Sequence, residues 1–305
     1  MSPRETSSGI VVGVDGSPSS NAAVAWAAKD AKMHCLPINL VYVSPPLPEF
    51  LGTEPPAPTA GEYSSWEEMH AHEVLEAAHK IAAEAAAPGG AYQISSEAFY
   101  AAPIVPTLID LSARAGMIVV GSHGQTAVAR AVLGSVSSGL VYHAKCPVAV
   151  IHDEHVLAAV PADAPVLVGV DGSPASERAT EIAFDEADRR GVGLVALHAW
   201  NDMGPLGFGR PGQAPVEWSN FEAREHEILA ERLSGWQERY PDVVVRKVVV
   251  SDRPAPRLLE QAESAQLVVV GSRGRGGFAG MLLGSVGRAV VDAARIPVIV
   301  ARASE

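Results

Sequence analysis

Short apolar runs recur along the chain and alternate with longer segments of helical composition. The first run, IVVGV at residues 10–14, is rich in β-branched residues and predicts a buried strand. A helix is predicted to begin at Pro18, because Ser17 can cap it and proline suits the first helical position. The next run, INLVYV at residues 38–43, predicts a second strand, so the chain opens with a β-α-β unit.

The same alternation continues to residue 151. A Pro-rich stretch at residues 44–63 predicts a long loop, and Ser65 with Glu68 matches a capping box that would start the second helix. Later elements are predicted as strands at residues 92–100, 117–120 and 147–151 and as helices at residues 105–115 and 135–144. Five strands alternating with four helices predict an open parallel α/β sheet.

The pattern then starts again in the second half of the chain. The segment VLVGVDGSP at residues 166–174 repeats IVVGVDGSP at residues 10–18, which places Asp171 on Asp15. A repeat this long indicates a tandem duplication of one fold, because the repeats of solenoids are much shorter. The predicted parts are a first domain at residues 1–152, a linker at residues 153–164 and a second domain at residues 165–305.

A glycine motif follows the predicted fourth strand of each half. Its spacing is Gly-x-x-Gly, nine residues, then Gly-Ser, and its members are Gly121, Gly124, Gly134 and Ser135 in one copy and Gly271, Gly274, Gly284 and Ser285 in the other. Glycines let backbone amides approach an anion closely, and a helix N-terminus directs unpaired N–H groups toward it. The motif therefore predicts a phosphate cradle, present twice.

Charge and cysteine content narrow the function classes. A formal net charge of −12 argues against a general affinity for nucleic acid or for anionic membranes. Cys35 and Cys146 form no CxxC or Cys-His pattern, which favours a reducing compartment and gives no reason to expect a metal site made of protein ligands. No window approaches the apolar length of a membrane span, so a cytoplasmic protein is expected.

These residues give the chain a resemblance to the universal stress protein family, in its tandem-domain, ATP-binding form. The resemblance covers nearly the whole chain and depends on the glycine motif and on the Asp-Gly-Ser-Pro turn after the first strand of each half. It implies two open, five-stranded parallel sheets flanked by helices, Rossmann-like or flavodoxin-like (adenine nucleotide alpha hydrolase-like), with strand order 3-2-1-4-5. In that order the ends of strands one and four meet at the switch point where open α/β sheets bind ligands.

The resemblance also implies a ligand, ATP, together with Mg²⁺. Asp15 and Asp171 resemble the acidic residue near the ribose, but an aspartate at this place could also simply end a turn. Its recurrence in both halves favours the ligand role. The nucleotide-binding set implied for the first domain is Gly13, Asp15, Val43, Gly121, Gly124, Arg130, Gly134, Ser135 and Val136. The set implied for the second domain is Gly169, Asp171, Ala199, Gly271, Arg273, Gly274, Gly284, Ser285 and Val286. Val43 and Ala199 resemble the strand-end positions that receive adenine.

The two predicted cradles differ in charge. The second domain has Arg273, Arg275 and Arg288 where the first has His123, Gln125 and Ser138, with Arg130 as partial compensation. Charge-assisted contacts to phosphate are about twice as strong as neutral ones, so tighter nucleotide binding is expected in the second domain.

The sequence carries no constellation typical of efficient hydrolysis. No Walker-type Gly-x-x-x-x-Gly-Lys motif is present, and no second acid or histidine recurs in both halves beside Asp15 and Asp171. The prediction is a nucleotide-dependent regulatory module of the stress response, with slow or no hydrolysis and no catalytic residues. A genuine ATPase or phosphotransferase using the same sites is the alternative, and an assembly protein with vestigial sites is a third hypothesis.

In the strand order that the resemblance implies, the predicted fifth strands, PVAVI and PVIVA, are apolar sheet edges. Because unpaired apolar edges tend to be covered, we expect the two domains to pair within the chain. A homodimer of two chains is a further expectation. The sequence specifies neither the regulated process nor a protein partner.

Overall fold

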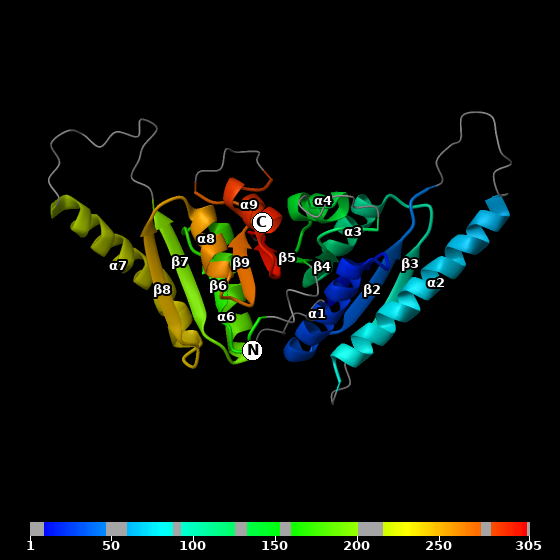
Figure 1. Ribbon diagram of the computed structural model, residues 1–305, viewed down its shortest axis with the longest axis horizontal. Coiled ribbons are helices and arrows are strands. Elements are labelled where there is room, and N and C mark those ends of the chain that lie inside the picture. The colour runs from blue at the N-terminus through cyan, green and yellow to red at the C-terminus, as the bar shows by residue number, and fades with distance from the viewer. Residues whose placement is uncertain are drawn as a thin grey trace, which may run out of the picture. The chain divides into compact units, whose positions relative to one another are not determined.

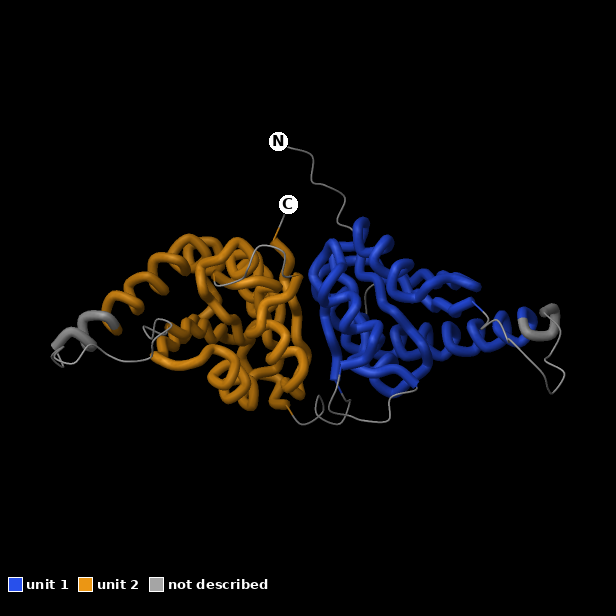
Figure 2. Tube along the Cα trace, turned by 90° about the horizontal axis from the view of Figure 1, so that it is seen from above, with its two compact units in different colours: residues 1–154 blue, residues 155–305 orange. Residues whose placement is uncertain are grey.

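The chain forms two units, Met1–Glu154 and His155–Glu305, hereafter unit 1 and unit 2 (Figure 2). The structure is a computed structural model that describes residues 9–46, 60–87, 93–125, 133–152, 160–200, 216–275 and 282–303. Part of the predicted linker, residues 153–159, lies outside the described residues.

In unit 1 the predicted strand order is confirmed. Five parallel strands follow the order β3-β2-β1-β4-β5. The elements are β1 (Ile10–Val14), α1 (Pro18–His34), β2 (Ile38–Val43), α2 (Ala60–Ala85), β3 (Ile94–Phe99), α3 (Ile104–Ser112), β4 (Met117–Gly121), α4 (Ser135–His143) and β5 (Val148–Ile151).

Unit 2 repeats this architecture with the order β8-β7-β6-β9-β10, again all parallel. Its elements are β6 (Val166–Gly169), α6 (Pro174–Arg190), β7 (Leu194–Trp200), α7 (Val216–Arg239), β8 (Val245–Ser251), α8 (Pro254–Ala262), β9 (Leu267–Gly271), α9 (Ser285–Ala293) and β10 (Val298–Ala301). The predicted α/β class with two tandem parallel sheets is therefore confirmed.

Helices cover both faces of each sheet. In unit 1, α1 and α2 pack together on one face and α3 and α4 on the other (Figure 1). The central strands are therefore buried on both sides, which explains why they read as continuous apolar runs such as the VLVG of β6. The outer strands β3 and β8 have partly exposed residues, in keeping with their mixed polarity.

The repeated Asp-Gly-Ser-Pro turn has a local explanation in both units. Gly16 and Gly172 have φ angles of 79° and 76°, a left-handed conformation that favours glycine. Ser17 and Ser173 then cap α1 and α6 by accepting hydrogen bonds from backbone amides of the first turn, and proline follows at the first helical position. The turn thus ends a strand and starts a helix within a few residues.

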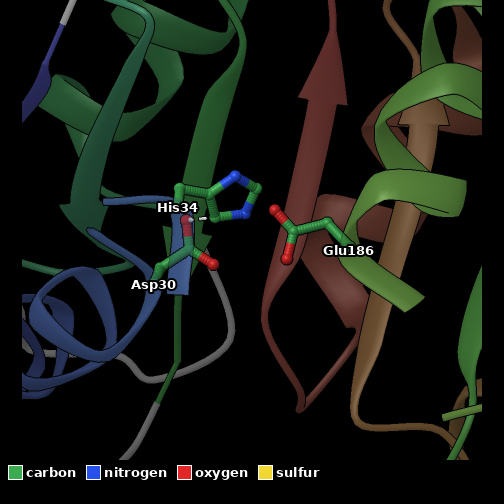
Figure 3. Close-up of side chains that lie close together, drawn as sticks. All are labelled: Asp30, His34 and Glu186. Atoms are coloured by element: carbon green, nitrogen blue, oxygen red, sulfur yellow. Dashed lines mark ion pairs between the residues drawn. The ribbon is translucent and has the colours of Figure 1, made fainter. Parts of the chain in front are cut away.

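The helices α1 and α6 each bury an acid beside a basic residue one turn later. In α1, Asp30 is 1% exposed and its Oδ2 lies 3.9 Å from His34 Nε2 (Figure 3). In α6, Glu186, also labelled in Figure 3, lies with its Oε2 2.7 Å from Arg190 Nη1. Each buried acid is accompanied by a basic group on its own helix, at the spacing at which helical side chains meet.

One boundary predicted from the sequence is wrong. The helix α2 begins at Ala60, so Ser65 and Glu68 lie inside it and do not form a capping box at its start. A capping signal is local, and a helix can continue past it when the preceding residues also adopt helical geometry. The proline-rich residues 47–59 lie outside the described part. Among the described helices, none combines the length and the apolar character needed to cross a bilayer.

The aromatic cluster around Phe184 should contribute to the stability of unit 2. Phe184 is fully buried, and its ring stacks on Trp236 and Tyr240, with centroid distances of 6.3 and 5.7 Å. Phe184→Ala should lower the free energy of unfolding of unit 2 by about 3–5 kcal/mol, through lost burial and the remaining cavity.

Urea denaturation followed by tryptophan fluorescence and by hydrogen exchange of unit-2 peptides measures this loss. The control is Val244→Ala, at a side chain that is 78% exposed, which should change stability by less than about 0.5 kcal/mol. Equal unfolding midpoints for the two variants would contradict a stabilising role of Phe184.

Candidate functional site

In unit 2 the site lies where the strand order reverses. β6 pairs with β9, and their chain connections lead to opposite sides of the sheet. Helices then leave from neighbouring strand ends on different faces, which opens a crevice at the carboxyl edge. A cavity of about 710 Å³ occupies this place.

The structure brings together all nine residues that the sequence singled out in unit 2. They line this cavity and are Gly169, Asp171, Ala199, Gly271, Arg273, Gly274, Gly284, Ser285 and Val286. They come from the ends of three strands, the turn after β6, the loop after β9 and the first turn of α9. Their role toward a ligand stays a prediction.

Asp171 joins the two loops of the cavity. Its Oδ1 accepts a hydrogen bond from the Ser173 amide at 2.9 Å, and its Oδ2 accepts one from the Arg275 amide at 3.0 Å. Since an ionised carboxylate has about four acceptor positions, further donors can still bind. The carboxylate therefore holds the loop after β9 against the turn after β6 and remains able to accept hydroxyl groups.

Asp15 does the same in unit 1. Its Oδ1 accepts from the Ser17 amide at 2.9 Å and its Oδ2 from the Gln125 amide at 3.3 Å. A Cβ atom at Gly124 would fall 2.9 Å from Asp15 Oδ2, so this glycine allows the carboxylate to approach the loop. The bridge across the switch point is thus present in both units.

Two glycines of the unit-2 motif are required by the close packing of unit 2, whether or not a ligand binds. A Cβ atom on Gly271 would lie 2.8 Å from the carbonyl carbon of Ala175 at the start of α6, and one on Gly274 would lie 2.5 Å from Asp171 Oδ2. Distances below about 3 Å force a displacement. The first part of the motif therefore has a packing explanation that the sequence did not reveal.

The last glycine of the motif has a different environment. A Cβ atom on Gly284 would have no neighbour closer than 3.6 Å, and Gly284 is the N-cap of α9 without a side-chain cap. Gly134 takes the same position before α4. The first turn of α9 lines the cavity through Ser285 and Val286. An uncapped helix N-terminus offers amide donors and a positive dipole end to an anion.

The remaining unit-1 residues lie at corresponding places. Gly13 is in β1, Val43 ends β2, Gly121 ends β4, and Ser135 and Val136 open α4. They belong to the same carboxyl edge as Asp15. Arg130 lies outside the described residues.

The sequence did not identify a pair of side chains in the unit-2 cavity, His198 of β7 and Glu225 of α7. His198 is 4% exposed, with Nδ1 2.6 Å from the Val170 carbonyl oxygen and Nε2 3.0 Å from Glu225 Oε2. Both ring nitrogens are therefore engaged. In unit 1, Glu67 of α2 instead accepts a hydrogen bond from the Ser44 hydroxyl. An acid near the start of both helices is the signal that could have been noticed.

The sequence also missed Arg232 of α7. A Cβ atom on Gly172 would fall 2.5 Å from Arg232 Cζ, so the guanidinium lies directly on the turn after β6. Burial lowers the pKa of Arg232 below its ordinary value, and the positive charge of Arg275 lowers it further. In unit 1, Val74 takes the place against Gly16. No local motif could have indicated this residue, because only the packing of α7 brings it to the site.

The carboxylate bridge can be tested without a ligand. Asp171→Asn retains one acceptor but loses the charge, which should cost about 1.5–3 kcal/mol at the loop. Amide exchange of residues 272–275 should accelerate on the order of ten- to a hundredfold, measured by hydrogen exchange and mass spectrometry. The control is Asp185→Asn, which removes an exposed ion pair with Arg189 on α6. Unchanged protection of the loop in Asp171→Asn would refute the bridge.

Comparison with known proteins agrees with the fold and with the resemblance seen in the sequence. The model of the universal stress protein family matches residues 8–152 and 164–302. Universal stress protein Rv1996 of Mycobacterium tuberculosis is 57% identical, with 99% of this chain and 97% of the relative covered. Universal stress protein Rv2623 of the same organism is 50% identical, covering 100% of this chain and 99% of the relative.

A solved structure shares the fold over nearly the whole chain. The crystal structure of a universal stress protein from Archaeoglobus fulgidus DSM 4304 aligns with a TM-score of 0.67 at 22% identity, covering 98% of this chain and 99% of that one. The family model and the relatives in Mycobacterium tuberculosis confirm the resemblance to the family and its tandem form. The chain belongs to the universal stress protein family and contains two of its domains in tandem.

Proposed function

We propose that the chain is a regulatory module that binds an adenine nucleotide, ATP, at the carboxyl edge of each sheet and hydrolyses it slowly or not at all. One observation carries the proposal. The uncapped N-terminus of α9 and the Asp171 carboxylate face one cavity, so amide donors for phosphate and an acceptor for hydroxyl groups lie together.

The arrangement of the cavity suggests how each part of the ligand would be held. The amides at Gly284, Ser285 and Val286 would bind phosphate oxygens, and Asp171 would accept ribose hydroxyl groups. The end of β7, at Ala199, would receive the base. In unit 1 the same roles would fall to the residues at corresponding places.

Mg²⁺ would fit this site only as a companion of the nucleotide. It prefers six oxygen ligands, including phosphates, waters and one or two carboxylates. Among the described residues, Asp171 is one of two acids that line the cavity, and the other, Glu225, is engaged by His198. Mg²⁺ would supply charge neutralisation between phosphates, with Asp171 as its nearest protein group.

The described residues of the cavity favour binding over turnover. A general base needs a free lone pair within reach of the attacking group. Both nitrogens of His198, the histidine lining the described cavity, are engaged by Val170 and Glu225.

The alternative remains an ATPase or phosphotransferase at the same sites. A cytoplasmic location, pairing of the domains and a homodimer stay predictions from the sequence.

Gly284→Val tests the proposed binding mode. The side chain should be accommodated, because a Cβ atom there has no neighbour closer than 3.6 Å, but it would cover the start of α9. Mass spectrometry of nucleotide released from heat-denatured protein should show the stoichiometry falling by about half, since the unit-1 site is untouched. The control is Gly235→Val on α7, where a Cβ atom meets nothing within 4 Å. A full complement of nucleotide in Gly284→Val would exclude phosphate binding at the start of α9.

Steady-state phosphate release separates the two functions. We expect fewer turnovers than about one per second, below the usual range of enzymes. Faster release that is lost in Asp15→Asn combined with Asp171→Asn would favour the ATPase.

A further inference from the structure

Two arginines line the unit-2 cavity, and a third lies on the turn beside it. Arg273 and Arg275 belong to the loop after β9 and line the cavity. Arg232 of α7 lies outside this lining, against Gly172 in the turn that carries Asp171, and near enough to Arg275 for the two charges to repel each other. Like charges this close are unfavourable unless an anion compensates them.

The protein compensates other arginines but not these two loop residues. Arg273 and Arg275 have no ion pair with a carboxylate within the described ranges of the chain. Five arginines on the helices of unit 2 do have such partners, and these are Arg178, Arg189, Arg190, Arg257 and Arg288. Two guanidinium groups without an ion pair in the described part of the chain thus line the cavity.

Arg232 is only partly compensated. Asp171 and Glu225 lie near enough to stabilise its charge. The Asp171 carboxylate already accepts two loop amides, and Glu225 is engaged by His198. The Nη1 atom of Arg232 is buried and has no hydrogen-bond partner among the described residues. A buried donor without a partner is costly.

Unit 1 shows that the fold does not need these cations. Val74 occupies the position of Arg232, while His123 and Gln125 stand where the second loop has Arg273 and Arg275. The carboxylate bridge and the uncapped helix are nevertheless present in both units. The arginines of unit 2 are therefore additional to the features that the two units share.

We propose that Arg232 is a specificity-determining residue of the unit-2 site and that, with Arg273 and Arg275, it selects nucleotides by the number of their phosphates. The site takes a nucleoside triphosphate in preference to the monophosphate, since each added phosphate brings negative charge to a region with excess guanidinium groups. This inference rests on the proposed nucleotide function and names the ligand charge that one of the two sites requires.

Affinities for AMP, ADP and ATP, measured by calorimetry on the full chain, test the selection. Gly134→Val is included throughout, so that only the unit-2 site binds. Arg232→Val, which introduces the unit-1 residue, should weaken ATP binding on the order of tenfold and AMP binding less than about threefold. Adding Arg273→His and Arg275→Gln should remove most of the remaining preference for ATP.

Two controls separate selectivity from folding. Arg239→Val removes an arginine at the far end of α7, where its guanidinium lies 5.7 Å from the Trp236 ring centroid, and it should leave the ATP-to-AMP affinity ratio unchanged. Arg232→Lys should recover part of the ratio, because a cation is restored. Retained AMP binding in Arg232→Val reports an intact site, so the ratio is informative even if stability falls.

The reciprocal exchange gives a gain of function. With Gly284→Val to block unit 2, the combined changes Val74→Arg, His123→Arg and Gln125→Arg should raise the ATP-to-AMP affinity ratio of unit 1 on the order of tenfold. An unchanged ratio in Arg232→Val overturns this inference while leaving nucleotide binding in place. Absence of any nucleotide binding by the unaltered chain overturns the proposed function itself.

Discussion

The carboxylate bridge across the switch point is the interaction on which each site depends. The strand order places the turn after the first strand beside the loop after the fourth, but it does not fix their relative positions. Asp171 does so by accepting one amide from each side, at 2.9 and 3.0 Å, and Asp15 does the same in unit 1. Hydrogen bonds to an ionised acceptor are strong, so they hold the glycine loop in place before any ligand binds. Less conformational entropy then remains to be lost on binding.

The structure explains the glycines of the motif differently from the sequence analysis. Gly274 is small because Asp171 must reach the loop, and Gly271 is small because α6 begins against β9. Of the three, only Gly284 could carry a Cβ atom at ordinary contact distance, with no neighbour closer than 3.6 Å. The spacing of the motif thus combines two packing requirements with one position suited to a ligand, and sequence reasoning had assigned all three to the ligand.

Local signals explain why much of the fold was predictable. The start of α1 follows from Ser17 and Pro18, and the strand order followed from the family resemblance. The start of α2 was misplaced because Ser65 carries a capping signal inside a helix that begins at Ala60. All nine unit-2 residues predicted for the site meet at one cavity. Arg232 was missed because it reaches the site only through tertiary packing of α7.

Comparison of the two units separates the features that both sites share from the side chains that differ between them. Both units keep the bridge and the uncapped helix, which act through backbone amides and a short acid. They differ in side chains outside the bridge and the helix N-terminus, such as Val74 and Arg232. Amide donors have fixed partial charges, whereas guanidinium groups exposed to solvent act through fields that salt screens over about 8–10 Å. One fold repeated within a chain can therefore hold two sites that share a carboxylate bridge and a helix N-terminus but differ in the charge of the surrounding side chains.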